Sequence, residues 1–522
     1  MHDTASGAAR VEWVTMFVRS ARLLVCSAFI LALSPTLACS SDDGAALATN
    51  PDSGAPIERH DPIDGGSDSS APVDRAKCSD GVMDAAETDV DCGGGCAPCG
   101  QCQRCLADAD CETTNCADGI CGPVKRGYPQ LSAERGEIRN LLATVEAGMR
   151  CDMDVYVDAV GIVGREMYRF SSKEPRYTTD LLGGGTSVLA SDAFYVTRPW
   201  TSRYWVARNA KRLETRSANA TDVTATDKKG YAAVAETVLA YQLLLDLTLS
   251  DEQGLRVDVE NDAQPARTKD EVLAHVMALL DDAKANLPGA TFDFSLSSGF
   301  EGFDTPSTFL KFNRALAARV AAYQKNWPLL LTTLGESFLS LNADLRLGVY
   351  MPFTNVPGDA RNSLFTAPNG EGDVRVAHPS FATDVATGDD RLLSTVLRST
   401  PASQAGLTSN RDAWRYTSAT APFPIIRNEE LVLLYAEARA QLGQFPDAIV
   451  AINRIRSVHN VSPYAGAVTP AALLNEILYQ RRYSLFLEGH RWVDVRRFGA
   501  LGTLPVDRPD DDVWSSFPVP KP

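Results

Sequence analysis

The sequence predicts a mainly α-helical protein built from paired helices and preceded by a small disulfide-rich module. Three observations carry this prediction. From about residue 128 the apolar residues recur with a helical period, long alternating β-strand patterns are absent, and nine cysteines fall between Cys78 and Cys121. A chain of 522 residues, 44% of them hydrophobic, is long enough for about two to four units and can bury most of its apolar surface.

The N-terminus predicts export from the cell. Arg19 and Arg22 precede an apolar run of eleven residues, Leu23–Leu33. Such a run is too short to span a bilayer as a helix, which takes about 20 residues, but it has the layout of a secretory signal. We therefore expect residues 1–38 to be a signal peptide, with Met16 as the alternative start of the chain.

A lipid anchor is expected directly after the signal. Thr36-Leu37-Ala38-Cys39 resembles a bacterial lipoprotein box, in which Cys39 would carry the lipid; ordinary signal cleavage nearby is the alternative. Residues 39–77 are rich in Ser, Asp, Gly, Pro and Ala and are predicted to be a flexible linker behind this anchor. The net charge of −16 excludes nucleic acid as a partner and limits contact with the bilayer to the anchor.

Residues 78–122 are predicted to form a cysteine-rich module. In an exported chain, disulfides are favoured over zinc as the explanation of CxxC pairs. Once Cys26 leaves with the signal and Cys39 carries lipid, ten candidates for five bridges remain, and one bridge would tie the module to the next domain. The candidates are Cys78, Cys92, Cys96, Cys99, Cys102, Cys105, Cys111, Cys116, Cys121 and Cys151.

The module also contains an acidic run, DGVMDAAETDVD. Its spacing does not fit an EF-hand calcium loop, so a solvated acidic face is the favoured interpretation. The residues concerned are Asp80, Asp84, Glu87, Asp89 and Asp91.

Helices are predicted with their caps in the region that follows. Thr268 is the expected N-cap of a helix, Glu271 completes a capping box, and Pro288-Gly289 ends the helix. Segments 230–249 and 309–324 have the same helical pattern. Segments 289–308 and 342–425 are expected to be rich in loops.

Residues 427–457 predict two helices around a tight turn at Gly443. The apolar stripe on each helix and the small residues between them are typical of a tetratricopeptide-type hairpin, which needs neighbours stacked on it. A further helix is expected after Thr469, with Pro470 in its first position and Gly489 as its breaker.

At this point the sequence resembles the closing region of the SusD/RagB family. The resemblance rests on RNEELVLLYAEARAQLG, AIVAINRIR, QRRYSLFLEGHRWVDVRRFG and the terminal FPVP. It extends more weakly to TSRYWVARNAKRL and HPSFATDVATGDDRL, so that a SusD/RagB-like domain is expected over residues 128–522. The family does not account for the cysteine-rich segment.

This resemblance implies a fold and a function. Its members fold as a superhelix of tetratricopeptide-like helix pairs with a loop-rich irregular portion. They are outer-membrane lipoproteins that face the cell exterior, bind a nutrient, most often a glycan or oligosaccharide, and pass it to a SusC-type TonB-dependent transporter. They are not enzymes. The alternative function is that of an adhesion or scaffold protein, in which the module and the superhelix make protein contacts.

The charged segment 480–499 has two interpretations. In the structural one, ion pairs lock the last helix onto the superhelix, and Arg481 and Glu488, seven apart, share one helical face. In the catalytic one, Glu488, His490 and Asp494 serve a glycoside hydrolase. The resemblance favours the structural role. The signature residues are Arg481, Glu488, Gly489, Arg491, Trp492 and Asp494.

No catalytic residue, cofactor or metal ligand is predicted elsewhere. Glu429 and Glu430 are adjacent on a helix and point about 100° apart, which does not suit a glycosidase pair. The six histidines lack metal-ligand spacing. The ligand-binding residues stay unknown, because each candidate aromatic is expected to lie in the core. These aromatics are Tyr195, Trp200, Tyr204, Trp205, Tyr350, Phe353 and Trp414.

Overall fold

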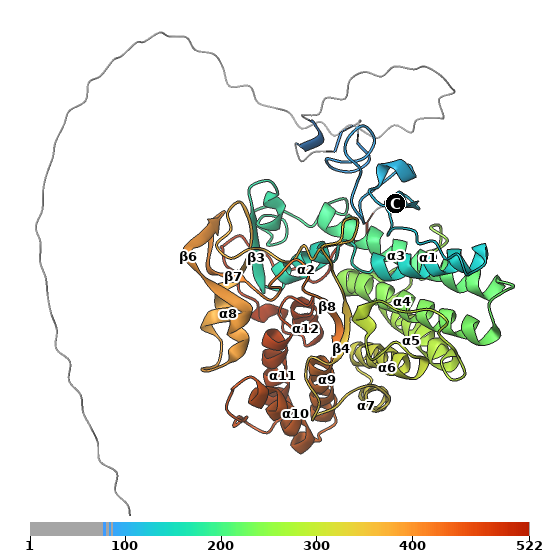
Figure 1. Ribbon diagram of the computed structural model, residues 1–522. Coiled ribbons are helices and arrows are strands. Elements are labelled where there is room, and N and C mark those ends of the chain that lie inside the picture. The colour runs from blue at the N-terminus through green and yellow to red at the C-terminus, as the bar shows by residue number, and fades with distance from the viewer. Residues whose placement is uncertain (1–76, 80–82, 85–86, 521–522) are drawn as a thin grey trace, which may run out of the picture. The chain divides into compact units, whose positions relative to one another are not determined.

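The structure is a computed structural model that describes residues 77–79, 83–84 and 87–520 (Figure 1). The predicted signal peptide, Cys39 and residues 39–76 of the predicted linker lie outside the described residues.

The predicted mainly helical fold is confirmed. Successive helices pack on each other, so that α3 lies against α1 and α4, and α5 lies between α4 and α6 (Figure 1). The helices of this part are α1 (Ala133–Gly148), α2 (Met153–Val163), α3 (Phe194–Asn219), α4 (Ala225–Ser250), α5 (Lys269–Asn286), α6 (Pro306–Tyr323) and α7 (Trp327–Glu336).

Local sequence signals explain these boundaries. The hydroxyl of Thr268 accepts the N–H of Glu271 at 3.4 Å, and the Glu271 carboxylate accepts the N–H of Thr268 at 2.9 Å. This is the predicted capping box at the start of α5. By length and composition α4 resembles a membrane-spanning helix, but 94% of its most apolar window is buried inside the protein, as in a core helix.

The C-terminal part contains the predicted hairpin. It consists of α9 (Asn428–Gln441) and α10 (Phe445–Val458), and Gly443 between them has a positive φ of 74°. Helix α11 (Pro470–Ser484) packs against both, and the three helices share a buried cluster that includes Val432, Ile452 and Ile477. The stacking that a lone hairpin requires is therefore supplied by α11 and α7, which both pack against α9.

Helix α11 is shorter than predicted. The sequence predicts a helix that continues to Gly489, but α11 ends at Ser484. Leu487 and Gly489 then adopt positive φ values of 55° and 82°, which turn the chain into α12 (Arg491–Arg497). Glu488 lies in this turn, so it does not share a helical face with Arg481, contrary to the prediction.

The structure contains strands that the sequence did not predict, most of them in the segment 342–425 that was expected to be rich in loops. An antiparallel sheet has the order β3-β5-β7-β6, and a second pairs β4 with β8. The elements are β3 (Met167–Ser171), β4 (Gly348–Met351), β5 (Asp373–Ala377), α8 (Pro379–Thr383), β6 (Thr395–Gln404), β7 (Leu407–Ala413) and β8 (Phe423–Arg427). Strand β6 is largely exposed and polar, and it contains Pro401, so it lacks the apolar alternation of a half-buried strand.

The predicted disulfide-rich module is confirmed. Its short strands β1 (Cys116–Ala117) and β2 (Ile120–Cys121) form a hairpin. All ten candidate cysteines pair, as Cys78–Cys96, Cys92–Cys99, Cys102–Cys151, Cys105–Cys116 and Cys111–Cys121.

Acidic side chains of the module hold its loops together. Asp89 accepts the backbone N–H of Arg104 at 2.7 Å, and Glu87 accepts that of Asp91 at 3.1 Å. Asp110 accepts the backbone N–H groups of Leu106 and Ala107. The module has few regular elements to satisfy its backbone, and these carboxylates take that role. The expected solvated acidic face needs correction for Glu87, which is 7% exposed.

Candidate functional site

An open cleft of about 800 Å³ lies between the module and the helical domain (residues 128–520). The module contributes the turn Asp118–Gly119, Arg104 and several of their neighbours. The helical domain contributes the end of β3, the segment that follows it, and the first turns of α3. A cleft of this size is large enough to hold a chain of several sugar rings.

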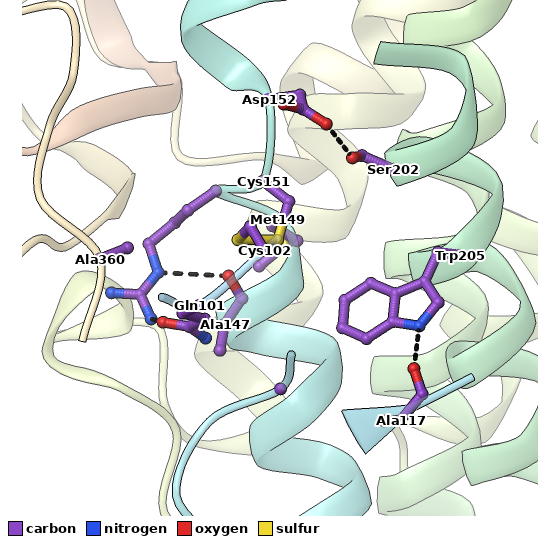
Figure 2. Close-up of a disulfide and its surroundings, with 12 residues drawn as sticks. Gln101, Cys102, Ala117, Ala147, Met149, Cys151, Asp152, Ser202, Trp205 and Ala360 are labelled. Carbon is purple, nitrogen blue, oxygen red and sulfur yellow. Dashed lines mark hydrogen bonds between the residues drawn. A yellow bond between two sulfur atoms is a disulfide. The ribbon is translucent and has the colours of Figure 1, made fainter. Parts of the chain in front are cut away.

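The module is fastened to the helical domain beside this cleft. The disulfide Cys102–Cys151 joins it to the chain segment between α1 and α2, as Figure 2 shows. The indole Nε1 of Trp205 in α3 donates to the carbonyl of Ala117 at 2.9 Å (Figure 2). Ile120 is 7% exposed and belongs to the main hydrophobic core. The cleft therefore has a fixed wall on the module side.

Helix α3 contributes polar residues to the cleft. Thr197 and Thr201 are one turn apart, so they share a face of the helix with Arg198 between them in sequence. Arg198 donates to one oxygen of Asp152 at 2.6 and 2.9 Å. The Ser202 hydroxyl donates to the other oxygen of Asp152 at 2.5 Å (Figure 2). These bonds hold the Arg198 side chain, which is 55% exposed, at the cleft surface.

Strand β3 supplies a second arginine, Arg169, at its middle position. Arg169 bonds Asp373 with two nitrogens at 2.9 and 2.7 Å, and it also donates to the buried Asp158 at 2.6 Å. Burial by itself raises the pKa of Asp373, but the bonds from Arg169 outweigh it and hold that pKa below its ordinary value. The Asp373 carboxylate therefore stays ionised and acts as a hydrogen-bond acceptor.

Two aromatic rings border the cleft next to these charges. Tyr177 and Phe194 meet edge to face with centroids 5.2 Å apart. The guanidinium of Arg169 lies 4.4 Å from the Tyr177 centroid, and that of Arg176 lies 4.8 Å from the Phe194 centroid. Phe194 is partly buried and Arg176 is exposed, so this edge offers an apolar surface surrounded by donors.

The aromatic residues considered from sequence are mostly core, as expected. Tyr195, Trp200, Tyr204, Trp205 and Phe353 are buried, whereas Tyr350 and Trp414 are partly buried. Of the seven, only Trp205 lines the cleft, and it is 3% exposed. The residues that do border the cleft, such as Phe194 and Arg198, carry no sequence motif that would have singled them out.

The signature segment is a buried network of ion pairs. Arg481 in α11 donates to Asp494 in α12 at 2.7 Å, and Arg497 donates to the other oxygen of Asp494 at 3.0 Å. Glu488 is bound by Arg427 of β8 at 2.9 Å and by Arg415 at 2.7 Å. The structure therefore pairs Arg481 with Asp494, and Glu488 with arginines outside the segment. Trp492 is fully buried beside them and donates to the carbonyl of Trp514 at 2.8 Å.

This network has no room for a substrate. The cavity that touches Glu488, Gly489 and His490 holds about 20 Å³, which is space for about one water molecule. Burial lowers the pKa of His490 to about 4, so its imidazole is neutral at pH 7. Arg491 lies next to His490, and burial lowers its pKa to about 10, so it stays charged at pH 7. The geometry favours the structural role of the segment over the catalytic one.

Comparison with known proteins gives a family match over a region that contains the signature segment 480–499. The sequence pattern of the SusD family matches residues 401–515, which run from the end of β6 to beyond α12. No curated protein matches the sequence.

Solved structures share the fold over most of the chain. Surface glycan-binding protein A from Bacteroides thetaiotaomicron is 14% identical with a TM-score of 0.58, over 73% of this chain and 95% of that chain. A structure of surface glycan-binding protein A from the same organism in complex with laminarihexaose is 14% identical with a TM-score of 0.56, over 70% of this chain and 91% of that chain. A SusD-like carbohydrate binding protein from Bacteroides vulgatus ATCC 8482 is 15% identical with a TM-score of 0.54, over 70% of this chain and 83% of that chain.

The resemblance read from the sequence is thereby confirmed: residues 401–515 match the SusD family, and the fold is similar to that of the solved SusD-like carbohydrate binding protein, with a disulfide-rich module in addition.

Proposed function

We propose that this protein is a lipid-anchored outer-membrane protein that faces the cell exterior, binds a glycan and delivers it to a SusC-type TonB-dependent transporter. The single observation that carries the binding part is the open cleft of about 800 Å³, on a fold shared with a protein solved in complex with laminarihexaose. The charged side chains and the Phe194 edge give this cleft the donors, acceptors and apolar surface that sugar rings require.

The cleft favours binding over catalysis. A glycosidase needs one carboxyl group with a raised pKa to protonate the leaving group. In the cleft, the pKa of Asp373 is lowered by its bonds to Arg169, and Asp152 is held by Arg198 and Ser202. These acidic groups are occupied as partners of donors, which suits recognition of hydroxyl groups.

A gentle detergent pull-down from membranes tests the delivery part. The protein carries a tag at its C-terminus, and mass spectrometry identifies what co-purifies. A stoichiometric TonB-dependent barrel is the expected result. An extracellular protein without such a barrel would favour the adhesion or scaffold function instead.

The anchor is tested separately with Cys39→Ala, a position outside the described residues. We expect the variant to leave the membrane fraction, because the cysteine is the proposed lipid site. Unchanged partitioning of the variant would contradict the anchor. Cys78→Ala is a control, because Cys78 is bonded to Cys96 and is not proposed to carry lipid.

A further inference from the structure

We infer that the cysteine-rich module is one wall of the glycan site and that the site takes a neutral oligosaccharide, held between the module and the start of α3. This inference rests on the proposed glycan-binding function. It assigns to the module a part in choosing the ligand, in place of a role as spacer or independent contact module.

The module is preorganised for this role. Asp118 and Gly119 form the two-residue turn of the β1–β2 hairpin, with positive φ values of 52° and 79°. The disulfides Cys105–Cys116 and Cys111–Cys121 hold the two strands of this hairpin. Asp118 is further paired with Arg212 of α3. The hairpin tip therefore lies in the cleft at a fixed position relative to α3, and little entropy is lost there when a ligand binds.

Arg104 is the module side chain best placed to reach a ligand. It lines the cleft and is exposed, and the structure places its backbone in the module by a bond from its N–H to Asp89 at 2.7 Å. Because the side chain is exposed, it does not pack in the core of the module. The backbone bond to Asp89 fixes the point from which it extends. A guanidinium at such a position donates several hydrogen bonds in a fixed geometry.

The charge pattern of the cleft favours a neutral ligand. Six basic and six acidic side chains line it. Four of the arginines already pair with carboxylates of this chain: Arg169 with Asp373, Arg176 with Glu174, Arg198 with Asp152, and Arg208 with Asp262. Arg104 and Lys173, the other two basic side chains of the lining, make no ion pair among the described residues. Away from these two, a uronate or sulfate group would meet carboxylates beside arginines that are already paired, in a protein of net charge −16.

Hydroxyl groups suit the same pairs. An arginine bound to a carboxylate still presents N–H donors, and the carboxylate keeps lone pairs that accept from a hydroxyl group. Phe194 adds an apolar edge for the C–H face of a sugar ring. A neutral oligosaccharide therefore finds donors, acceptors and an apolar contact without displacing an ion pair.

The test uses the full mature chain. An array of neutral, uronate-containing and sulfated oligosaccharides of six sugars first identifies what the protein binds. Calorimetry then measures the Kd of the best neutral probe for the parent protein, for Arg104→Glu and for the control Lys125→Glu. Lys125 is also exposed and lies close in sequence, but it does not line the cleft. Thermal unfolding checks that both variants fold.

We expect a neutral probe to bind best, Arg104→Glu to weaken its binding at least about tenfold, and Lys125→Glu to change it less than twofold. Equal affinities of the two variants for the probe would contradict the inference that the module is one wall of the glycan site. The proposed glycan-binding function would not be affected by that result. Tighter binding of uronate-containing or sulfated probes would contradict the inference that the ligand is a neutral oligosaccharide. Failure of every glycan to bind would overturn the proposed function itself.

Discussion

Arg481 of α11 bonds Asp494 of α12 at 2.7 Å, with side chains only 1% and 2% exposed. Burial by itself raises the pKa of Asp494, but Arg481 and Arg497 outweigh it, so that this pKa lies below its ordinary value. Loss of one partner from a buried ion pair leaves an uncompensated charge, which costs about 3–5 kcal/mol.

Removal of Arg481 should therefore destabilise the fold strongly. We expect Arg481→Met to lower the free energy of unfolding by about 3 kcal/mol, the lower end of that range, because Arg497 still contacts Asp494. Chemical denaturation measures the change. The control is Arg346→Met, which breaks a surface pair with Asp344 whose side chains are 84% and 57% exposed, and should cost less than about 1 kcal/mol. Equal losses in the two variants would contradict the structural role of the signature segment.

Glu166 should make stability depend on pH. Burial raises its pKa to about 8, and the backbone of Leu487 and the charge of Arg491 offset this only in part. The folded protein then holds a proton on Glu166 that the unfolded chain loses above about pH 4.5. The stability that protonated Glu166 contributes is complete below pH 4.5 and is lost as pH rises through about 8. Over this range the free energy of unfolding falls by up to about 1.4 kcal/mol per pH unit.

The variant Glu166→Gln tests this pH dependence. Gln keeps the shape of the protonated carboxyl, so the variant should lose less stability between pH 5 and pH 8 than the parent protein does. Denaturant midpoints at several pH values measure the difference. Glu112→Gln, at an exposed position in the module, should leave the slope unchanged. A slope for Glu166→Gln equal to that of the parent would show that Glu166 is ionised in the folded state.

The disulfide Cys102–Cys151 should stabilise the module against the helical domain. It closes a loop with a sequence separation of 49, for which chain entropy predicts about 4 kcal/mol. We expect Cys102→Ser with Cys151→Ser to lower the free energy of unfolding by about 2–4 kcal/mol. The matched control is Cys78→Ser with Cys96→Ser, which opens a loop with a separation of 18 and should cost less. A smaller loss for the first pair than for the second would contradict this order.

A bulky side chain at Thr201 should block the cleft. Thr201 is exposed on α3 and lines the cleft, so Thr201→Trp places an indole in the volume assigned to the ligand. We expect at least about a tenfold loss of affinity for the best neutral oligosaccharide, measured by calorimetry. Thr332→Trp, at an exposed position of α7 that does not line the cleft, is the control. Unchanged affinity of Thr201→Trp for the oligosaccharide would show that the ligand binds outside this cleft.

The helices were predictable because their signals are local. The period of apolar residues, the Thr268 cap and the turn at Gly443 each act within a few residues of chain, and the structure contains each of them. The exposed strand β6 was missed because its polar residues carry no apolar alternation. The pairing of Glu488 with Arg427 was missed because β8 lies far away in sequence.

The cleft was not predictable for a related reason. Its lining comes from residues 83–120, 152–208 and 372–373, which only the folded chain brings together. The cysteine count predicted five bridges, one of them to the next domain, but not that Cys102 makes that bridge and so sets the position of the hairpin tip. The sequence signature at 480–499 marks a structural network, while the residues that line the proposed binding cleft lie outside that segment.

The place of the ligand can be seen in a crystal structure of the mature protein soaked with its best neutral oligosaccharide. We expect sugar rings in the cleft between α3 and the module, within hydrogen-bond distance of both Arg198 and Arg104. Sugar bound on another surface, with the cleft empty, would contradict this expectation.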